Sequence, residues 1–202
     1  PWIDENISGV VESWESGTKA GTAVAEVLFG EVNPGGKLPL TFPRSVGQLQ
    51  MIYNHKPSQY FHKYAFEKVT PLYPFGYGLS YSNFEYSDFK VDEVIDDKIS
   101  ISVNVTNDSG FDGEEVVQLY FRDSYSSVTR PVKELVRYKR VMIASGETVT
   151  IDFEVDVQDL AFYDINMNLC VEMGEFEFMV GGSSDNKQLM SETVDIKKRY
   201  DY

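Results

Sequence analysis

The spacing of hydrophobic residues changes near residue 80. Before that point, apolar residues recur at intervals of three and four, which is the spacing of one face of an α-helix. Beyond it, apolar and polar residues alternate, which is typical of half-buried β-strands. The pattern therefore predicts a short part with helices at residues 1–45, an irregular linker at residues 46–82 and a β-rich part at residues 83–202.

Two helices are predicted in the first part. The first has its apolar side chains on one face, at Ile7, Val10, Val11 and Trp14. Asp4 precedes them as a candidate N-cap. The second has a stripe at Ala20, Ala23, Val24, Val27 and Leu28, and Gly30 would end it. The small alanines on this stripe favour close packing against a sheet or another helix.

The chain then becomes irregular. A turn at residues 33–36 (NPGG) leads to residues 37–42, a short strand that Pro39 restricts to a sheet edge or an irregular extended segment. The linker shows no sustained period, and so long a loop is usually functional or wrapped over a neighbouring domain. Two helices and one strand are too few to close a sheet. We therefore interpret residues 1–45 as the C-terminal remnant of a larger α/β domain.

The alternating part predicts seven short strands with turns between them and no helix. This profile is typical of an immunoglobulin-like β-sandwich. The Cys…Trp…Cys signature of antibody domains is absent, so a fibronectin type III-like sandwich fits better, and the predicted fold class is mainly β. The strands are expected at residues 84–91, 99–106, 115–121, 137–143, 148–155, 175–180 and 189–196.

Composition narrows the possible functions. The chain has 18 Lys and Arg against 32 Asp and Glu, a net charge of −14 that disfavours nucleic-acid binding. No stretch approaches the roughly 18 consecutive apolar residues of a membrane span. A single cysteine, Cys170, excludes an internal disulfide and multi-cysteine metal sites, and its apolar neighbours favour a buried, inert thiol. The glycines form no nucleotide-binding motif, and no cofactor or metal is expected.

Several carboxylates could carry chemistry, but structural roles are favoured for them. Glu114 and Glu115 are neighbours on a strand and point to opposite faces, so a solvated strand entrance is the favoured interpretation. Four acidic residues at 92–93 and 96–97 flank a turn and could bind calcium, but they lack the spacing of a calcium-binding loop. Helix caps and turns are the favoured roles of Asp156, Asp159 and Asp164.

The linker contains the candidate binding residues, His55, Tyr60 and His62. Histidine and tyrosine on a loop suit polar, planar ligands such as sugars, through stacking and hydroxyl hydrogen bonds. The alternative is that aromatic side chains pin the linker to a neighbouring domain. We favour this alternative, because an irregular segment needs anchors whether or not it binds a ligand.

Ordered motifs give the chain a resemblance to glycoside hydrolase family 3. Residues 20–39 (AGTAVAEVLFGEVNPGGKLP) resemble the family segment G-x-A-x-A-x-x-L-F-G-x-x-N-P-x-G-x-L-P. Residues 53–58 (YNHKPS) and 71–81 (PLYPFGYGLSY) are similar to its later signatures. Residues 115–120, 130–135 and 159–164 resemble its fibronectin type III-like domain. The resemblance spans nearly the whole chain.

The resemblance implies the C-terminal portion of a retaining, exo-acting β-glycosidase of the β-glucosidase or β-xylosidase type. Such enzymes use an aspartate nucleophile on a (β/α)₈ barrel and a glutamate acid/base, about 5–5.5 Å apart. Both positions are expected outside this chain, so none of its residues is assigned as catalytic, and the isolated chain is expected to be inactive. Its partners would be the missing barrel and α/β parts, which also bring the oligosaccharide or aryl glycoside substrate.

The sequence is compatible with more than one parent protein. A free-standing fibronectin-like module that binds carbohydrate or protein is the alternative function. The barrel could precede or follow this segment, and the parent enzyme could be a homodimer. The chain begins with Pro1 and not with Met, so the absence of a signal peptide says nothing about the compartment. A periplasmic or secreted location is favoured.

Overall fold

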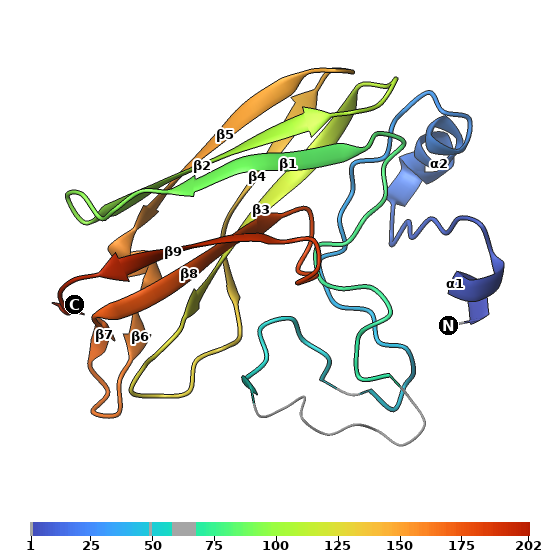
Figure 1. Ribbon diagram of the computed structural model, residues 1–202. Coiled ribbons are helices and arrows are strands. Elements are labelled where there is room, and N and C mark those ends of the chain that lie inside the picture. Colours follow the sequence, from blue (N-terminus) through green and yellow to red (C-terminus); the bar gives the residue numbers. More distant parts are fainter. Residues whose placement is uncertain (1, 49, 58–67) are drawn as a thin grey trace.

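Two antiparallel sheets face each other across an apolar core in the second half of the chain (Figure 1). The computed structural model describes residues 2–48, 50–57 and 68–202. The first sheet has the order β1-β2-β5, with β1 (Phe84–Val91), β2 (Lys98–Asn107) and β5 (Thr148–Asp156). The second has the order β4-β3-β8-β9, with β4 (Glu134–Ile143), β3 (Gly113–Asp123), β8 (Gly174–Gly181) and β9 (Met190–Ile196).

All seven predicted strands are confirmed within a few residues of their expected bounds. Among the described residues, three further strands were not predicted, because two or three residues are too short to show a period. They form a small sheet in the order β10-β7-β6, with β6 (Phe162–Tyr163), β7 (Leu169–Val171) and β10 (Tyr200–Asp201). The fold is thus the expected mainly β sandwich, and the small sheet extends one end of it (Figure 1).

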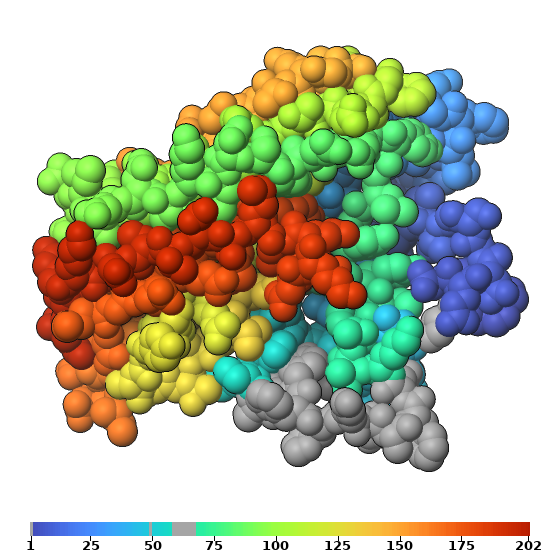
Figure 2. Space-filling model, in the orientation of Figure 1, coloured from blue at the N-terminus to red at the C-terminus, as the bar shows by residue number. Residues whose placement is uncertain are grey.

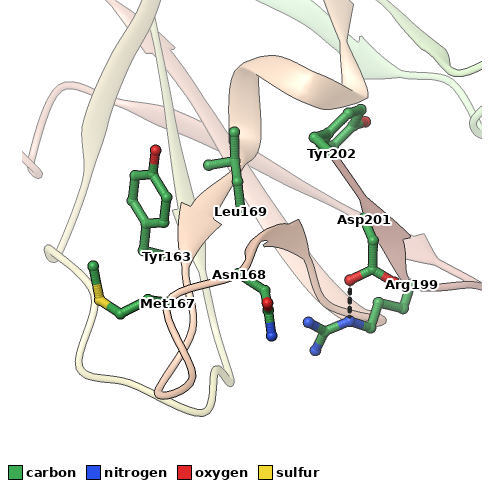
Figure 3. Close-up of a pocket in the computed structure, with 7 residues that line it drawn as sticks. All are labelled: Tyr163, Met167, Asn168, Leu169, Arg199, Asp201 and Tyr202. Carbon is green, nitrogen blue, oxygen red and sulfur yellow. Dashed lines mark hydrogen bonds and ion pairs between the residues drawn. The ribbon is translucent and has the colours of Figure 1, made fainter.

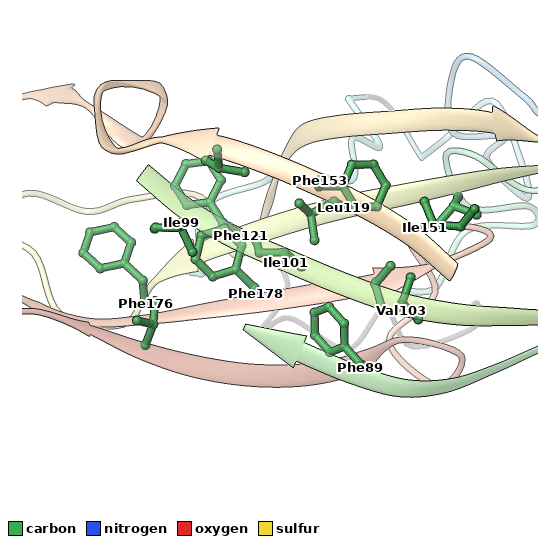
Figure 4. Packing of buried hydrophobic residues seen from close by; sticks show 14 of the residues in the cluster. Phe89, Ile99, Ile101, Val103, Leu119, Phe121, Ile151, Phe153, Phe176 and Phe178 are labelled. Carbon is green, nitrogen blue, oxygen red and sulfur yellow. The ribbon is translucent and has the colours of Figure 1, made fainter. Parts of the chain in front are cut away.

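The core forms from the inward-facing residues of both sheets (Figure 4). Along β2, the inward side chains alternate with polar residues that face solvent. They meet Leu119 and Phe121 of β3 and the phenylalanines of β8 across the sandwich. Each such side chain contributes about 1.5–3 kcal/mol when it is fully buried. The inward residues of β2 are Ile99, Ile101, Val103 and Val105.

The turn at Asp96 and Asp97 joins β1 to β2. Both residues have positive φ angles, 50° and 62°, as a two-residue type I′ hairpin turn requires. Asp97 forms an ion pair with Lys198 at 3.4 Å. Among the described residues, no group of three or more His, Cys, Asp or Glu side chains could hold a metal ion. The turn interpretation is therefore confirmed, and the structure gives the calcium alternative no support.

In the described part of the chain before the sandwich, the α-helices are α1 (Trp2–Asn6) and α2 (Ala20–Leu28), with a 3₁₀ turn at Gly17–Lys19 between them. The predicted second helix is confirmed as α2, but no residue of α2 is buried, so the expected close packing of its stripe is not seen within this chain. Helices of globular proteins depend on packing of their apolar face more than on intrinsic propensity. No helix in the described ranges is long and apolar enough to cross a bilayer.

The predicted helix over Ile7–Trp14 is wrong. Helix α1 ends at Asn6, and Asp4 lies inside it and not at its N-cap. Residues 7–14 are irregular, and Trp14 has a φ of 47°, outside the helical region. The apolar side chains of the predicted stripe are about half exposed, with 48% for Ile7 and 53% for Trp14. The Trp14 ring meets the Phe42 ring edge to face at 6.1 Å, but the stripe as a whole stays half exposed. Its β-branched residues also have low helix propensity.

The predicted strand at residues 37–42 does not form as a regular strand. The segment runs antiparallel to residues 73–77, with backbone hydrogen bonds from Leu38 N to the Tyr77 oxygen and from Phe42 N to the Tyr73 oxygen, both 2.8 Å. Only Phe42 and Tyr73 form a bridge. Pro39 has no N–H to donate, which interrupts the ladder and leaves the irregular extended segment that was the other expectation.

The small sheet is tied to the end of the chain by Asp164, which is 6% exposed. Its carboxylate accepts hydrogen bonds from the backbone N–H groups of Asn166 (2.9 Å) and Asn168 (3.0 Å) and from Arg199 (2.7 Å). The Arg199 bond and these backbone bonds lower the pKa of Asp164 to about 2. Cys170, in β7, is buried as predicted, and burial raises the pKa of its thiol.

We predict that the Asp164 carboxylate makes the free energy of unfolding depend on pH between about 4 and 2. Its pKa is lower in the folded chain than the usual value near 3.9, so its stabilising contribution is complete above pH 4 and is lost as the pH falls toward 2. Arg199→Gln should lower stability at pH 6 and flatten the pH dependence in this window, as measured by urea unfolding at a series of pH values.

The matched control is Arg140→Gln, because the ion pair between Arg140 and Glu114 lies on the exposed face of the sheet. Exposed pairs of this kind contribute about 0–1 kcal/mol. The control should keep the wild-type slope between pH 4 and 2. Equal slopes for wild type and Arg199→Gln would contradict the assignment.

Candidate functional site

The outer face of β3 is buried under the linker. Along β3, Val117, Leu119 and Phe121 face the core, so Gln118 and Tyr120 face outward. These two outward side chains are nevertheless only 3% and 0% exposed. The residues that cover them come from two segments of the linker, 53–55 and 75–76, and from the turn after β8. We call this contact surface, together with the part around Lys37 and Asn33 described below, the joint.

Aromatic rings form the centre of the joint. The rings of Tyr53 and Phe75 stack with their centroids 4.4 Å apart, and Tyr53 meets Tyr120 edge to face at 5.8 Å. The Tyr53 hydroxyl oxygen accepts a hydrogen bond from the backbone N–H of Leu135 in β4 (3.3 Å). Burial raises the pKa of Tyr120 far above its usual value, so its hydroxyl stays protonated. Such aromatic pairs contribute about 0.5–1.5 kcal/mol beyond the area that they bury.

Gln118 satisfies the backbone groups beside these rings. Its amide N–H groups donate to the carbonyl oxygens of Gly76 (3.2 Å) and Gly182 (2.7 Å), and its Oε1 accepts a hydrogen bond from Tyr120 (2.5 Å). Gly76 has a φ of 78°, and a Cβ there would lie 2.0 Å from Gln118 Oε1. Only glycine fits this position, because both the backbone conformation and the space exclude a side chain.

Lys133, which immediately precedes β4, links the sandwich to the turn after β8. The residue is 4% exposed, and its ammonium donates to the carbonyl oxygen of Ser184 (2.8 Å) and to Asn186. Burial lowers the pKa of Lys133 to about 8. The backbone N–H of Ser184 in turn donates to the Phe75 oxygen (2.9 Å) of the linker. The turn is therefore held on one side by the sandwich and on the other by the linker.

A buried ion pair lies at the edge of the joint, where the first segment of the chain meets the sandwich. Lys37 Nζ lies 3.0 Å from Glu115 Oε2, and the two side chains are 14% and 4% exposed. Glu115 also accepts a hydrogen bond from the Tyr86 hydroxyl (2.8 Å), and Lys37 donates to the Gly78 oxygen (3.3 Å). Burial and the neighbouring Glu115 carboxylate raise the pKa of Tyr86 well above its usual value.

The interpretation of Glu115 as a solvated residue is therefore wrong, although Glu114 and Glu115 do point to opposite faces. Glu114 is partly exposed and pairs with Arg140 at 2.9 Å. Glu115 lies on the side of β3 that also carries Val117 and Leu119, which face the core. The same alternation in the sequence therefore placed Glu115 on the buried face. Its partner Lys37, 78 positions earlier, could not be identified from the pattern.

Asn33 completes the joint with its side-chain amide. Its Nδ2 donates to Ser82 Oγ (2.8 Å) and to the Asp112 oxygen (2.9 Å). Its Oδ1 accepts hydrogen bonds from Ser80 Oγ and the Tyr81 N–H, both 2.8 Å. An amide side chain has two donor hydrogens and two acceptor sites, and Asn33 uses all four. The turn at residues 33–36 is thereby fixed to both the end of the linker and the loop before β3.

Of the candidate binding residues, only His55 lies in the described part, since Tyr60 and His62 fall outside it. The His55 carbonyl oxygen accepts a hydrogen bond from Val132 N (2.9 Å), and its ring Nδ1 lies 3.0 Å from the Lys56 oxygen. Burial lowers the pKa of His55. These contacts are those of a linker anchored on the sandwich. Sugar binding by His55, Tyr60 and His62 stays a prediction.

Apolar side chains are exposed over the first 32 residues of the chain. Leu28 at the end of α2 is 63% exposed, and Phe29 after it is 84% exposed. Figure 2 shows this part of the chain at the opposite end of the molecule from the small sheet. Large exposed apolar patches mark surfaces that meet another protein part. The other exposed apolar residues here are Trp2, Ile3, Ile7, Val10, Val11, Trp14 and Val32.

A hollow of about 660 Å³ lies on the small sheet, at the end of the sandwich away from α1 and α2 (Figures 1 and 3). Its walls come from the turn between β6 and β7 and from the last residues of the chain. No pattern in the sequence predicts this hollow, because the strands that form it are too short to show a period. The lining residues are Tyr163, Met167, Asn168, Leu169, Arg199, Asp201 and Tyr202.

Comparisons with known proteins agree with this architecture. The chain is 41% identical to a β-xylosidase of Formosa agariphila over 97% of the chain and 28% of that protein. It is 40% identical to a periplasmic β-glucosidase of Salmonella typhimurium over 90% of the chain and 25% of that protein. A solved β-glucosidase structure from Erythrobacter marinus superposes with a TM-score of 0.90 and 39% identity, over 96% of the chain and 26% of that structure.

The chain thus spans about a quarter of the length of the relatives that it matches. Residues 1–81 match the glycosyl hydrolase family 3 C-terminal domain, and residues 115–184 match a fibronectin type III-like domain. The joint connects these two regions. The chain carries part of the C-terminal domain of glycoside hydrolase family 3 and a fibronectin type III-like domain. It therefore belongs to glycoside hydrolase family 3.

Proposed function

We propose that the chain is the C-terminal portion of a retaining, exo-acting β-glycosidase that removes terminal non-reducing β-linked sugars, with β-glucose as the first candidate. This proposal rests on one observation. The chain contains both matched regions, and the β-glucosidase and β-xylosidase relatives that it resembles are about four times as long. The nucleophile and the acid/base would lie in the part of the enzyme that this chain does not include.

Within that enzyme, the role of this chain is structural. The exposed apolar surface around α2 would pack on the rest of the α/β domain, and the joint would hold the sandwich in one orientation against it. Buried, fully paired polar groups such as Asn33 and Gln118 support this role, because they define a single geometry. The barrel and the α/β domain are therefore the proposed partners of this chain.

A free-standing fibronectin-like module has less support. Residues 1–81 match a glycosidase domain and not a linker of arbitrary sequence. They also fold onto the sandwich through buried contacts, among them the Lys37–Glu115 pair. A module that worked alone would have no use for the exposed surface of α2.

The first prediction from this proposal is that the isolated 202-residue chain does not hydrolyse an aryl β-glucoside, whereas the protein from the complete reading frame does. Two carboxyl groups in a substrate-sized cleft are needed for retaining hydrolysis, and we place both outside this chain. Release of 4-nitrophenol from the aryl glucoside measures this. Turnover by the purified chain would contradict the assignment, as would a complete protein with no glycosidase activity on aryl glucosides or xylosides.

The second prediction concerns the exposed apolar surface. Leu28→Ser and Phe29→Ser should leave the unfolding of the isolated chain nearly unchanged, because both side chains are exposed there. In the complete enzyme, each should cost about 1.5–3 kcal/mol, the value of a buried apolar side chain. Met142→Ser is the control, since Met142 is also 60% exposed but lies on β4. Equal effects of Leu28→Ser in both proteins would exclude a docking role.

The third prediction tests the buried ion pair. Lys37→Met or Glu115→Leu should each destabilise the chain by about 3–5 kcal/mol, because one buried charge is left without its partner. The double variant should recover much of this loss, since a buried pair can often be replaced by apolar residues. Urea unfolding of the four proteins gives the coupling energy. Additive losses in the double variant would show that the two residues act independently.

A further inference from the structure

Strand β5 lies at an open edge of its sheet. In the described part of the chain, β2 is the only strand hydrogen-bonded to β5, so the backbone groups on the other side of β5 have no strand partner. An edge of this kind is a template on which a strand of another chain can pair. Figure 1 shows β5 along the margin of the molecule, where a second chain has access to it.

The hydrogen bonds at the two ends of β5 identify the residues that face this edge. The Asn107 N–H donates to the Glu147 oxygen, and the Val157 N–H donates to the Asp97 oxygen, both 2.9 Å. Residues 147 and 157 therefore point toward β2. Because successive residues of a strand direct their backbone groups to opposite sides, the even-numbered residues of 148–156 point toward the open edge.

Two cations of β4, which belongs to the opposite sheet, reach across to this edge. Lys139 Nζ donates to the Asp152 oxygen, and Arg137 Nε donates to the Glu154 oxygen (3.2 Å). Lys139 Nζ also lies 5.5 Å from the centroid of the Phe153 ring. Hydrogen bonds from charged donors are stronger than those between neutral groups. Both side chains thus occupy carbonyl groups that a further strand would need.

A carboxylate covers a third backbone group of the same edge. Asp159 Oδ2 accepts a hydrogen bond from the Asp156 N–H (3.1 Å) and also pairs with the Arg137 guanidinium. The outward carbonyls of Asp152 and Glu154 and the outward N–H of Asp156 are therefore all bonded to side chains. A strand that pairs along this edge has to displace them.

Other edges of the sandwich are interrupted in different ways. The pairing of β1 with β2 shifts register between Ser87 and Lys90, where Asp88 has a φ of 51°. Such a bulge distorts an edge. Near the start of β4, the Leu135 N–H donates to the Tyr53 hydroxyl oxygen of the linker (3.3 Å). Strand β5 is regular and is not covered by the linker, so its protection depends on side chains.

Without those side chains, β5 suits a second copy of itself. Residues 148–155 (TVTIDFEV) are rich in β-branched residues, which favour strands. Two such strands can pair antiparallel about a twofold axis at Thr150, with Thr148 of one copy opposite Asp152 of the other. No two like charges lie directly opposite each other in this register. The Asp152 oxygen would then accept from the Thr148 N–H, at the position that Lys139 occupies.

We propose that Arg137 and Lys139 are edge guards, which keep β5 from pairing with the β5 of a second copy of the chain. The inference goes beyond the proposed hydrolytic function and does not depend on it. The guards act because their stems lie across the open edge and their charged ends hold its carbonyl groups. Their loss leaves these carbonyls to a new strand.

The test compares the 202-residue chain with Arg137→Ala/Lys139→Ala by sedimentation velocity over a series of protein concentrations. The double variant should dimerise with an association constant about ten-fold or more above that of the wild type, because the freed carbonyls become ladder acceptors. Amide hydrogen exchange followed by NMR should be slowed at Thr148, Thr150 and Asp152 in the dimer. Lys139→Ala alone should show the same changes to a smaller extent, and it serves as the test if the double variant does not fold.

Arg140→Ala is the matched control, because Arg140 is also a cation of β4 but pairs with Glu114 on the outer face. It should leave the mass unchanged, and Lys139→Arg should stay as the wild type because it keeps a donor. The proposal is overturned if the variants that lack the guards gain no association, or if Arg140→Ala gains as much. It is also overturned if association leaves exchange at β5 unchanged, since the exposed surface around α2 would then hold the copies together.

Discussion

The contact between the linker and the outer face of β3 is the interaction on which the rest of this structure depends. In an antiparallel sandwich, the outer face of each sheet can be exposed to water. The outward side chains of a strand such as β3 would then be polar and solvated. Here Gln118 and Tyr120 are buried on that face, and Gln118 donates to backbone carbonyls of both the linker and the sandwich. Without the linker, these groups would lose their partners. The linker is therefore an integral part of the folded unit.

Within the joint, apolar and polar contacts have different roles. The stacked rings of Tyr53 and Phe75 supply burial, which is favourable but allows many orientations. The Lys37–Glu115 pair gains little net free energy, because desolvation of two charges offsets their attraction. Its contribution is to select one arrangement, since any other would leave a buried charge unpaired. A rigid connection between two domains needs both kinds of contact.

The sequence predicted the sandwich well, because strands such as β2 bury every second residue and the period survives in the sequence. It failed over Ile7–Trp14, where the apolar stripe stays about half exposed in this chain, and at Glu115, whose partner is remote in sequence. The hollow on the small sheet was out of reach for a third reason. Its residues are brought together by strands of two or three residues, which are recognisable only once the large sheets have placed them.

The pairing of Asn33 with Asp112 spans 79 residues of chain. Because a ribosome makes the chain from its N-terminus, residues 33–37 exist for some time before any group on β3 is available to them. Their polar side chains stay hydrated during that interval, and the joint cannot close until residues 112–118 have been made. The region that matches the glycosidase domain therefore gains these contacts only after the start of β3 has been made. A nascent chain that stops within the linker would lack them.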